Sequence, residues 1–247
     1  STNNANVRQS YIVTCRLFGI FPVKDIEVVL VDGDAVYAGG MPIGIYVKTS
    51  GVLVIGTSEV ERPDGSEAAP AENILKAGDY ILSVNGEKVA EKEDLQRLVQ
   101  QNGAEKEILK INRKGEEVEV GVTPVQNKNG TYMLGAWVRD DLAGIGTLTY
   151  YKEDGTYGAL GHAVSDGDVG GRIQMSEGYV YNAQIIGVKK GQKGNPGELS
   201  GMIRYQSADC LGTIEENTDI GIYGKLDGNI AALPRGDYYN ICYKQDI

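Results

Sequence analysis

The residue with the clearest capacity for chemistry is His162, the only histidine among 247 residues. Imidazole is the one side chain whose ordinary pKa, about 6.5, allows it to take and return a proton near neutral pH. A lone histidine is more often a packed or surface residue, but this one closes the run YGALGH and is followed by polar residues and glycine. That arrangement is typical of a strand opening into a loop, where rigid scaffolds present reactive groups. If the protein performs acid–base chemistry through an imidazole, His162 is the residue that performs it.

Two carboxylates follow this histidine closely, Asp166 and Asp168. A histidine that acts as a base needs a third group to orient it, and either aspartate has the chemistry for that role. Aspartate in a glycine-rich stretch also caps turns through its side chain, and the turn role is the favoured interpretation.

Composition narrows the classes of function. The formal net charge is −10 and no basic stripe is present, so nucleic acid is excluded as a partner and an anionic membrane surface is disfavoured. No apolar run approaches the roughly 20 residues that span a bilayer, and residues 1–10 lack the pattern of a signal peptide. Membrane attachment is expected only through an anchor outside these residues. No metal site and no organic cofactor is implied.

The amino-acid usage favours a mainly β protein with a few helices. Glycine is abundant at 34 residues, 15 of the aromatic residues are tyrosine, and helix-length apolar periodicity is scarce. The three cysteines, Cys15, Cys210 and Cys242, are widely spaced and odd in number, which fits neither a metal site nor a disulfide framework. At least one thiol is therefore expected to be free.

The elements that must hold any site differ between the two halves of the chain. In the first half, residues 90–102 place Leu95 and Leu98 on one face of a predicted helix. Residues 79–89 predict a short hairpin with an Asn-Gly turn, and residues 109–122 predict a second hairpin around a Lys-Gly turn.

Residues 42–45, with the sequence PIGI, and residues 70–89, PAENILKAGDYILSVNGEKV, resemble PDZ domains. This resemblance covers about residues 27–124. It implies that Ile43, Gly44 and Ile45 bind a peptide with a free C-terminus, by a carboxylate-binding loop and strand addition, and that Leu95 and Leu98 line the groove. Alternatively, such a loop only packs internally.

The polar connector at residues 124–130 is the predicted domain boundary, and short strands separated by turns follow it. We therefore predict a lead segment at residues 1–26, a PDZ domain at 27–125 and a second β domain at 126–247. The strand pattern of the second domain suits a barrel or a sandwich.

Four runs in this second domain are similar in order and spacing to SpoIVB peptidases: LGAWVRDDLAGIGTLTYY, ALGHAVSDGD, KKGQKGNPGEL and IGIYGKL. These are sporulation serine endopeptidases with a membrane anchor, a PDZ domain and a chymotrypsin-like double β-barrel protease domain. The resemblance implies that His162 is the general base. It also implies export to the space between the forespore and mother-cell membranes, and cleavage of a regulator of sigma-factor processing.

The family's nucleophile motif, Gly-Met-Ser-Gly-Ser-Pro, does not occur in the sequence, and the nearest imitation, around Ser200, lacks the expected surroundings. We therefore expect the protease domain to be incomplete at its C-terminus and the 247 residues to be inactive as they stand. An incomplete barrel would leave unpaired strand edges, so self-association is expected. The PDZ domain is also placed to bind the chain's own terminus. The alternative is a PDZ scaffold or regulatory protein without catalysis.

Overall fold

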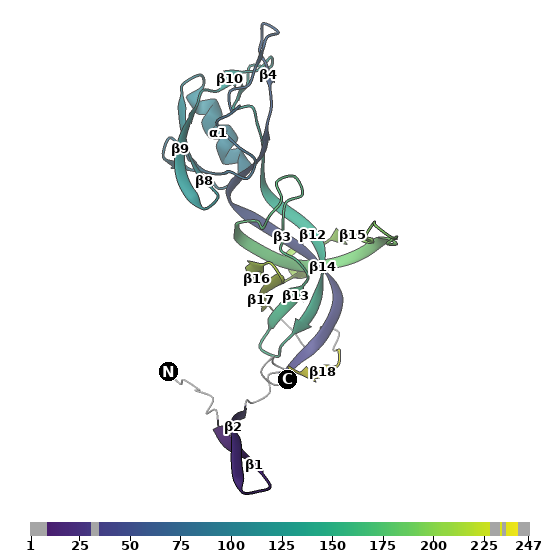
Figure 1. Ribbon diagram of the computed structural model, residues 1–247. Helices are drawn as coiled ribbons and strands as arrows, with labels where there is room; N and C mark the ends of the chain where they lie inside the picture. Colours follow the sequence, from purple (N-terminus) through teal and green to yellow (C-terminus); the bar gives the residue numbers. More distant parts are fainter. Residues whose placement is uncertain (1–8, 31–34, 228–232, 234–235, 242–247) are drawn as a thin grey trace.

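The computed structural model describes residues 9–30, 35–227, 233 and 236–241 (Figure 1). Strands dominate, and the single α-helix found within these ranges is α1 (Lys92–Asn102). Within the same ranges no helix is long and apolar enough to cross a membrane. Cys15 and Cys210 carry free thiols, whereas Cys242 lies outside the described residues.

A closed barrel of six antiparallel strands forms the centre of the molecule (Figure 1). Its strands pair in turn, and the last pairs back with the first. In ring order they are β3 (Ala35–Thr57), β12 (Ala136–Tyr151), β13 (Thr156–Leu160), β17 (Gly221–Leu226), β16 (Cys210–Thr218) and β14 (Met175–Lys189). Buried residues including Leu148, Tyr157 and Ile222 fill the interior. The expected open barrel edge is therefore wrong for the described residues, because β14 pairs with both β16 and β3.

The sheet continues from the barrel into a helix-bearing module, which we define as residues 51–139 (Figure 1). Its main strands lie in the order β3, β6, β8 and β9, and α1 packs on them through buried Leu95, Leu98 and Val99. The strands β6 (Tyr80–Val84), β7 (Glu87–Lys88), β8 (Glu107–Arg113) and β9 (Glu116–Val122) belong to the main sheet. Two small hairpins, β4 (Val60–Glu61) with β5 (Glu67–Ala68) and β10 (Val125–Gln126) with β11 (Tyr132–Met133), complete the module.

The predicted helix and both predicted hairpins of this module are confirmed. The helix ends where Gly103 adopts a φ of 64°. Asn85 and Gly86 have φ values of 50° and 85°, which is the left-handed pair that a two-residue hairpin turn demands.

The predicted loop at residues 42–45 is wrong, because these residues lie inside the uninterrupted 23-residue strand β3. Ile43 pairs with Gly146 of β12 on one edge and with Asn182 of β14 on the other. Its side chain is fully buried in the barrel core. Long-range pairing, invisible to local sequence patterns, thus makes this segment a barrel strand.

Two strands cross between the helix-bearing module and the barrel, so the predicted boundary near residue 126 does not separate the two cores. Val47 of β3 lies in the barrel core, whereas Val52 of the same strand lies in the core of the module. Val138, near the start of β12, packs on the core of the module, and Leu148 of that strand lies in the barrel.

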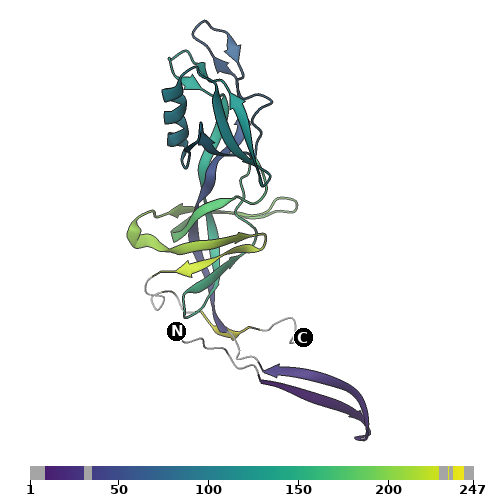
Figure 2. The same ribbon diagram turned by 90° about the vertical axis from the view of Figure 1, so that its left-hand side faces the viewer.

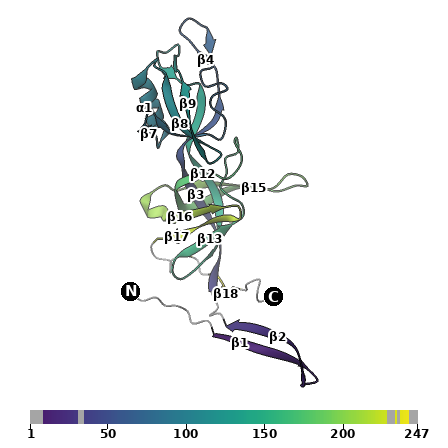
Figure 3. The same cartoon turned by 60° about the vertical axis from the view of Figure 1, so that its left-hand side comes forward.

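Peripheral elements flank the barrel (Figures 2 and 3). A separate hairpin is formed by β1 (Gln9–Leu17) and β2 (Phe21–Leu30). Strand β15 (Glu198–Ile203) extends from β14, the short helix η1 (Ser207–Asp209) precedes β16, and β18 (Tyr238–Asn240) pairs with the start of β3.

Candidate functional site

His162 lies directly after β13, and the backbone on its N-terminal side is held at two points. The Leu160 N–H donates to Oγ1 of Thr149 at 2.8 Å. The Gly161 N–H donates to the carbonyl of Ile220 at 3.1 Å. The end of β13 is thereby fixed to two neighbouring elements of the barrel, and this sets the position from which the imidazole projects.

The backbone that follows His162 is held by Asn217 of β16. The side-chain carbonyl of Asn217 accepts from the Val164 N–H at 2.8 Å, and its amide group donates to the carbonyls of Val164 and Ile173 at 3.0 and 3.3 Å. One half-buried amide therefore ties both ends of the segment 163–173, which we call the histidine loop. Local sequence patterns did not single out this residue, because it lies more than 50 positions away.

The imidazole of His162 is exposed, and its Nδ1 lies 2.7 Å from the carbonyl oxygen of Ala163. A carbonyl can only accept, so this hydrogen bond requires the proton to be on Nδ1. Nε2 of the neutral ring then has a free lone pair and is available as a proton acceptor. This is the tautomer that a general base needs.

A cavity of about 230 Å³ opens beside His162. It lies between strand β12 and the segment from the end of β13 into the histidine loop, and its walls are mostly apolar. Two hydroxyl side chains, Thr147 and Ser165, also line it. A base at the rim of an apolar hollow is the arrangement expected where a reacting group must be shielded from water.

Asp166 organises the histidine loop from within. Its side chain is fully buried and pairs with Arg139 of β12. Its Oδ1 accepts from the N–H groups of Asp168 and Val169 at 2.8 and 3.1 Å. Asp168 is exposed and lies 3.4 Å from Arg139. The contacts of Asp166 thus agree with its favoured interpretation as a turn residue, whereas the side chain of Asp168 contacts Arg139.

In the part of the chain that the structure describes, no carboxylate hydrogen-bonds to His162, whose ring contacts only the adjacent carbonyl. Ser200 does not hydrogen-bond to the imidazole either. Its exposed side chain belongs to β15, where Ser200 pairs with Gly187 of β14. Ser200 also does not line the cavity. The role of His162 as general base therefore stays a prediction, and neither a carboxylate nor a nucleophile is placed beside it in the described residues.

The histidine loop packs on the helix-bearing module as well as on the barrel. Ile173 is buried against Leu53 and Tyr80 in a third apolar cluster. The next residue, Gln174, donates its N–H to the Tyr80 hydroxyl at 3.1 Å and accepts from the Ser50 N–H at 2.8 Å. Burial raises the pKa of Tyr80, which keeps this hydroxyl neutral. The position of the loop is thus set partly by the module.

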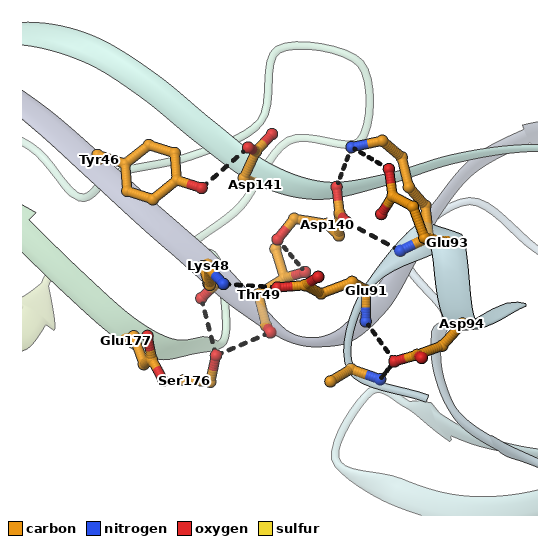
Figure 4. Close-up of polar contacts among 12 residues, drawn as sticks. Tyr46, Lys48, Thr49, Glu91, Glu93, Asp94, Asp140, Asp141, Ser176 and Glu177 are labelled. Atoms are coloured by element: carbon orange, nitrogen blue, oxygen red, sulfur yellow. Dashed lines mark hydrogen bonds and ion pairs between the residues drawn. The ribbon is translucent and has the colours of Figure 1, made fainter. Parts of the chain in front are cut away.

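Polar contacts join the N-terminus of α1 to the two crossing strands (Figure 4). Lys92 donates from its backbone N–H and its Nζ to the carboxylate of Asp140, both at 2.9 Å. Lys48 of β3 pairs with Glu91 at 2.6 Å. Burial tends to raise the pKa of Asp140, but the hydrogen bonds from Lys92 outweigh it and lower that pKa overall.

The five residues predicted to bind a peptide are not brought together. Gly44 and Ile45 pair with both β12 and β14, so β3 has no free edge there to accept a further strand. A Cβ at Gly44 would lie 2.5 Å from Ile203 of β15, so this glycine permits β15 to cross β3 closely. Leu95 and Leu98 are buried in the core of the module, away from the barrel core that contains Ile43.

A larger hollow of about 730 Å³ lies on the helix-bearing module, between its β6–β7 hairpin and strands β8 and β9. Leu82 and Ile108 contribute apolar surface to it, and Lys110 pairs with Glu117 at its rim. Within the described ranges, no group of three or more His, Cys, Asp or Glu residues lies close enough to hold a metal ion.

Comparison with protein families gives two matches. Residues 130–247 match the family described as SpoIVB peptidase S55, and residues 63–113 match the PDZ domain family. The first match contains β12, β13 and His162, and the second contains α1 and the strands β6 to β8. A comparison with curated protein sequences found no match.

Proposed function

We propose that this chain, which carries a PDZ domain and a SpoIVB peptidase S55 domain, acts as a serine endopeptidase whose general base is His162. The observation that carries the proposal is the place of His162 within the matched peptidase domain. It stands at the end of a barrel strand, at the rim of a cavity, with Nδ1 on a carbonyl and Nε2 free.

In this mechanism, Nε2 of His162 accepts the proton of a hydroxyl nucleophile as that oxygen attacks a peptide carbonyl, and later returns the proton to the leaving amine. The Ala163 carbonyl fixes the tautomer and the ring orientation. A neutral carbonyl stabilises the imidazolium less than a carboxylate does, so full activity requires an acidic partner. By resemblance to the family, the nucleophile belongs to a Gly-Met-Ser-Gly-Ser-Pro motif that the 247 residues lack.

The PDZ domain recruits a peptide or protein to the peptidase, and the resemblance to SpoIVB peptidases names a regulator of sigma-factor processing as the substrate. The same resemblance places the protein in the space between the forespore and mother-cell membranes. Since β12 and β14 occupy both edges of β3 beside Ile45, the recruited peptide binds elsewhere on the PDZ domain.

One observation favours the alternative of a scaffold without catalysis. His162 has no carboxylate or hydroxyl hydrogen-bonded to it within the described residues. A PDZ domain joined to a peptidase-like barrel would then serve only to hold partners together.

Replacement of His162 by alanine in the complete encoded protein distinguishes the two functions. Loss of the base is expected to lower kcat by a factor on the order of 10³ or more against an unstructured protein substrate. The melting temperature should not change, because the ring is exposed. Asp219→Asn, an exposed carboxylate on the nearby β16–β17 turn, is the matched control. Equal activity of His162→Ala and wild type would rule out His162 as the base.

A further inference from the structure

The β1–β2 hairpin projects away from the barrel (Figure 2). Several of its apolar side chains are exposed within the described chain. Its strands pair with each other and with no other strand among the described residues. Phe18 is 84% exposed, Ile20 69% and Phe21 64%. Single exposed apolar residues are common on proteins, but a contiguous group of this size marks an interaction surface.

The register of the hairpin places two apolar pairs on one face, Val13 with Ile26 and, at the tip, Leu17 with Phe21, because directly opposed residues project to the same face of a sheet. The pair between them, Cys15 with Lys24, lies on the same face, and the register shifts after it. The alternate pair, Thr14 with Asp25, is polar. An isolated two-stranded hairpin is marginally stable in water, so this element needs a surface that covers its apolar face.

The tip has the composition of a lipid-binding element. Every side chain from residue 17 to residue 23, LFGIFPV, lacks a hydrogen-bonding group. A docking site for a folded protein normally includes polar side chains around its apolar centre, whereas hydrocarbon requires none. Two backbone positions of the tip also carry no unsatisfied N–H group, because the Ile20 N–H donates to the Leu17 carbonyl and Pro22 has no N–H.

Two cations stand at the base of this tip. Arg16 is opposite Pro22, and Lys24 is opposite Cys15. No acidic residue occurs from residue 15 to residue 24, although the chain as a whole has a net charge of −10. Lys24 is five residues from Gly19 at the turn, which is roughly 15 Å along an extended strand. Cations at that distance reach the phosphate level when an apolar tip enters the interfacial region.

We propose that the β1–β2 hairpin inserts the tip at residues 17–23 into the surface of an anionic lipid bilayer, with Arg16 and Lys24 against the lipid phosphates. The site is separate from the His162 cavity and does not depend on the peptidase activity. It gives the chain a peripheral contact with a membrane through a strand hairpin, in spite of the overall negative charge.

Vesicle binding tests the proposal directly. The protein is mixed with vesicles of phosphatidylcholine alone, or with vesicles that also contain about 30 mol% phosphatidylglycerol and therefore have an anionic surface. The bound protein is measured by flotation. We expect the wild-type protein to bind the anionic vesicles. In the double variant Phe18→Asp/Phe21→Asp the bound fraction should fall at least about tenfold, since a charge opposes insertion. Ile220→Asp, which replaces an equally exposed residue on the β16–β17 turn, is the matched control. Arg16→Gln/Lys24→Gln should lose the preference for phosphatidylglycerol.

A tryptophan at the tip reports insertion itself. In a Trp137→Phe background, which removes the native tryptophan, the emission of Phe18→Trp should shift to the blue with anionic vesicles and be quenched by brominated acyl chains. Equal flotation of the double aspartate variant and Ile220→Asp would overturn the proposal. A dimer that the aspartate variant dissociates, without any vesicle binding, would overturn it in favour of a second copy of this chain.

Discussion

At the scale of single residues, the buried carboxyl of Glu107 is the least well satisfied group in the described chain. Its side chain is fully buried in the helix-bearing module, and Oε2 has no hydrogen-bond partner. Oε1 has one long contact, 3.4 Å from the amide of Asn102. Burial therefore raises the pKa of Glu107, and the Asn102 amide offsets this only in part.

Glu107→Gln is expected to stabilise the protein at pH 7 by about 1 kcal/mol, because it removes the cost of a buried charge. The raised pKa in the folded state favours the protonated form, so the contribution of Glu107 to stability is most favourable below the unfolded pKa of about 4.3 and is lost as pH rises through the folded pKa. Urea unfolding from pH 4 to pH 8 should show this decline in wild type and a smaller one in the variant. If Glu107→Gln showed the same pH dependence of stability as wild type, the raised pKa of Glu107 would be refuted. Glu119→Gln, at an exposed position on the neighbouring strand, is the control.

The prediction of His162 as the general base rests on its residue type and setting, whereas the groups that hold its backbone could not be predicted from the sequence. Thr149 and Asn217 act through hydrogen bonds to the backbone on either side of the histidine. Neither has a distinctive neighbouring sequence, because threonine and asparagine occur throughout β proteins. Their role becomes visible only when the barrel brings β12 and β16 beside the end of β13.

At the scale of elements, local structure was predictable and strand pairing was not. The helix α1 follows from its apolar spacing, and the turn at Lys114 and Gly115 follows from residues that adopt positive φ. The alternation of Ile43, Ile45 and Val47 is compatible with the observed strand, although residues 42–45 were predicted to form a loop. Alternation does not specify the partner, since a peptide, β12 or β14 would satisfy the same backbone groups.

The contact between α1 and β12 is expected to contribute to stability through the pair Lys92 and Asp140. Asp140 is only 9% exposed in its side chain, whereas Lys92 is 41% exposed. Asp140→Asn should therefore lower the free energy of unfolding by about 1–2 kcal/mol, and Lys92→Met should lower it by less. The double-mutant cycle should give a coupling energy of about 0.5–1 kcal/mol between the two residues.

The pH dependence supplies a second readout for this pair. The lowered pKa of Asp140 means that its stabilisation is present above the unfolded value of about 3.9 and is lost as pH falls through the folded value. The free energies of unfolding of Asp140→Asn and wild type should therefore become similar at acidic pH. Additive single effects in urea unfolding at pH 7 would show that the contact contributes no coupling. The exposed pair Lys128 and Glu61 provides a comparison cycle.

At the scale of the whole molecule, two continuous strands join the PDZ domain to the barrel. Because β3 and β12 belong to both cores, the two parts share a sheet instead of a flexible linker. The histidine loop rests on both, through Asn217 of the barrel and Tyr80 of the module. The segment that follows His162 therefore packs on both cores.

The final prediction concerns a protein made of the 247 residues alone. Covalent catalysis needs a nucleophile held against its base, and Ser200 neither lines the cavity beside His162 nor hydrogen-bonds to the ring. Such a protein should be folded, because its barrel closes on itself. It should nevertheless neither cleave an unstructured protein nor react with a fluorophosphonate probe. The cleavage and labelling assays are also performed on the variants Ser200→Ala and Ser165→Ala. Cleavage and labelling that vanish only in Ser200→Ala would make Ser200 the nucleophile, and loss only in Ser165→Ala would assign that role to the hydroxyl that lines the cavity.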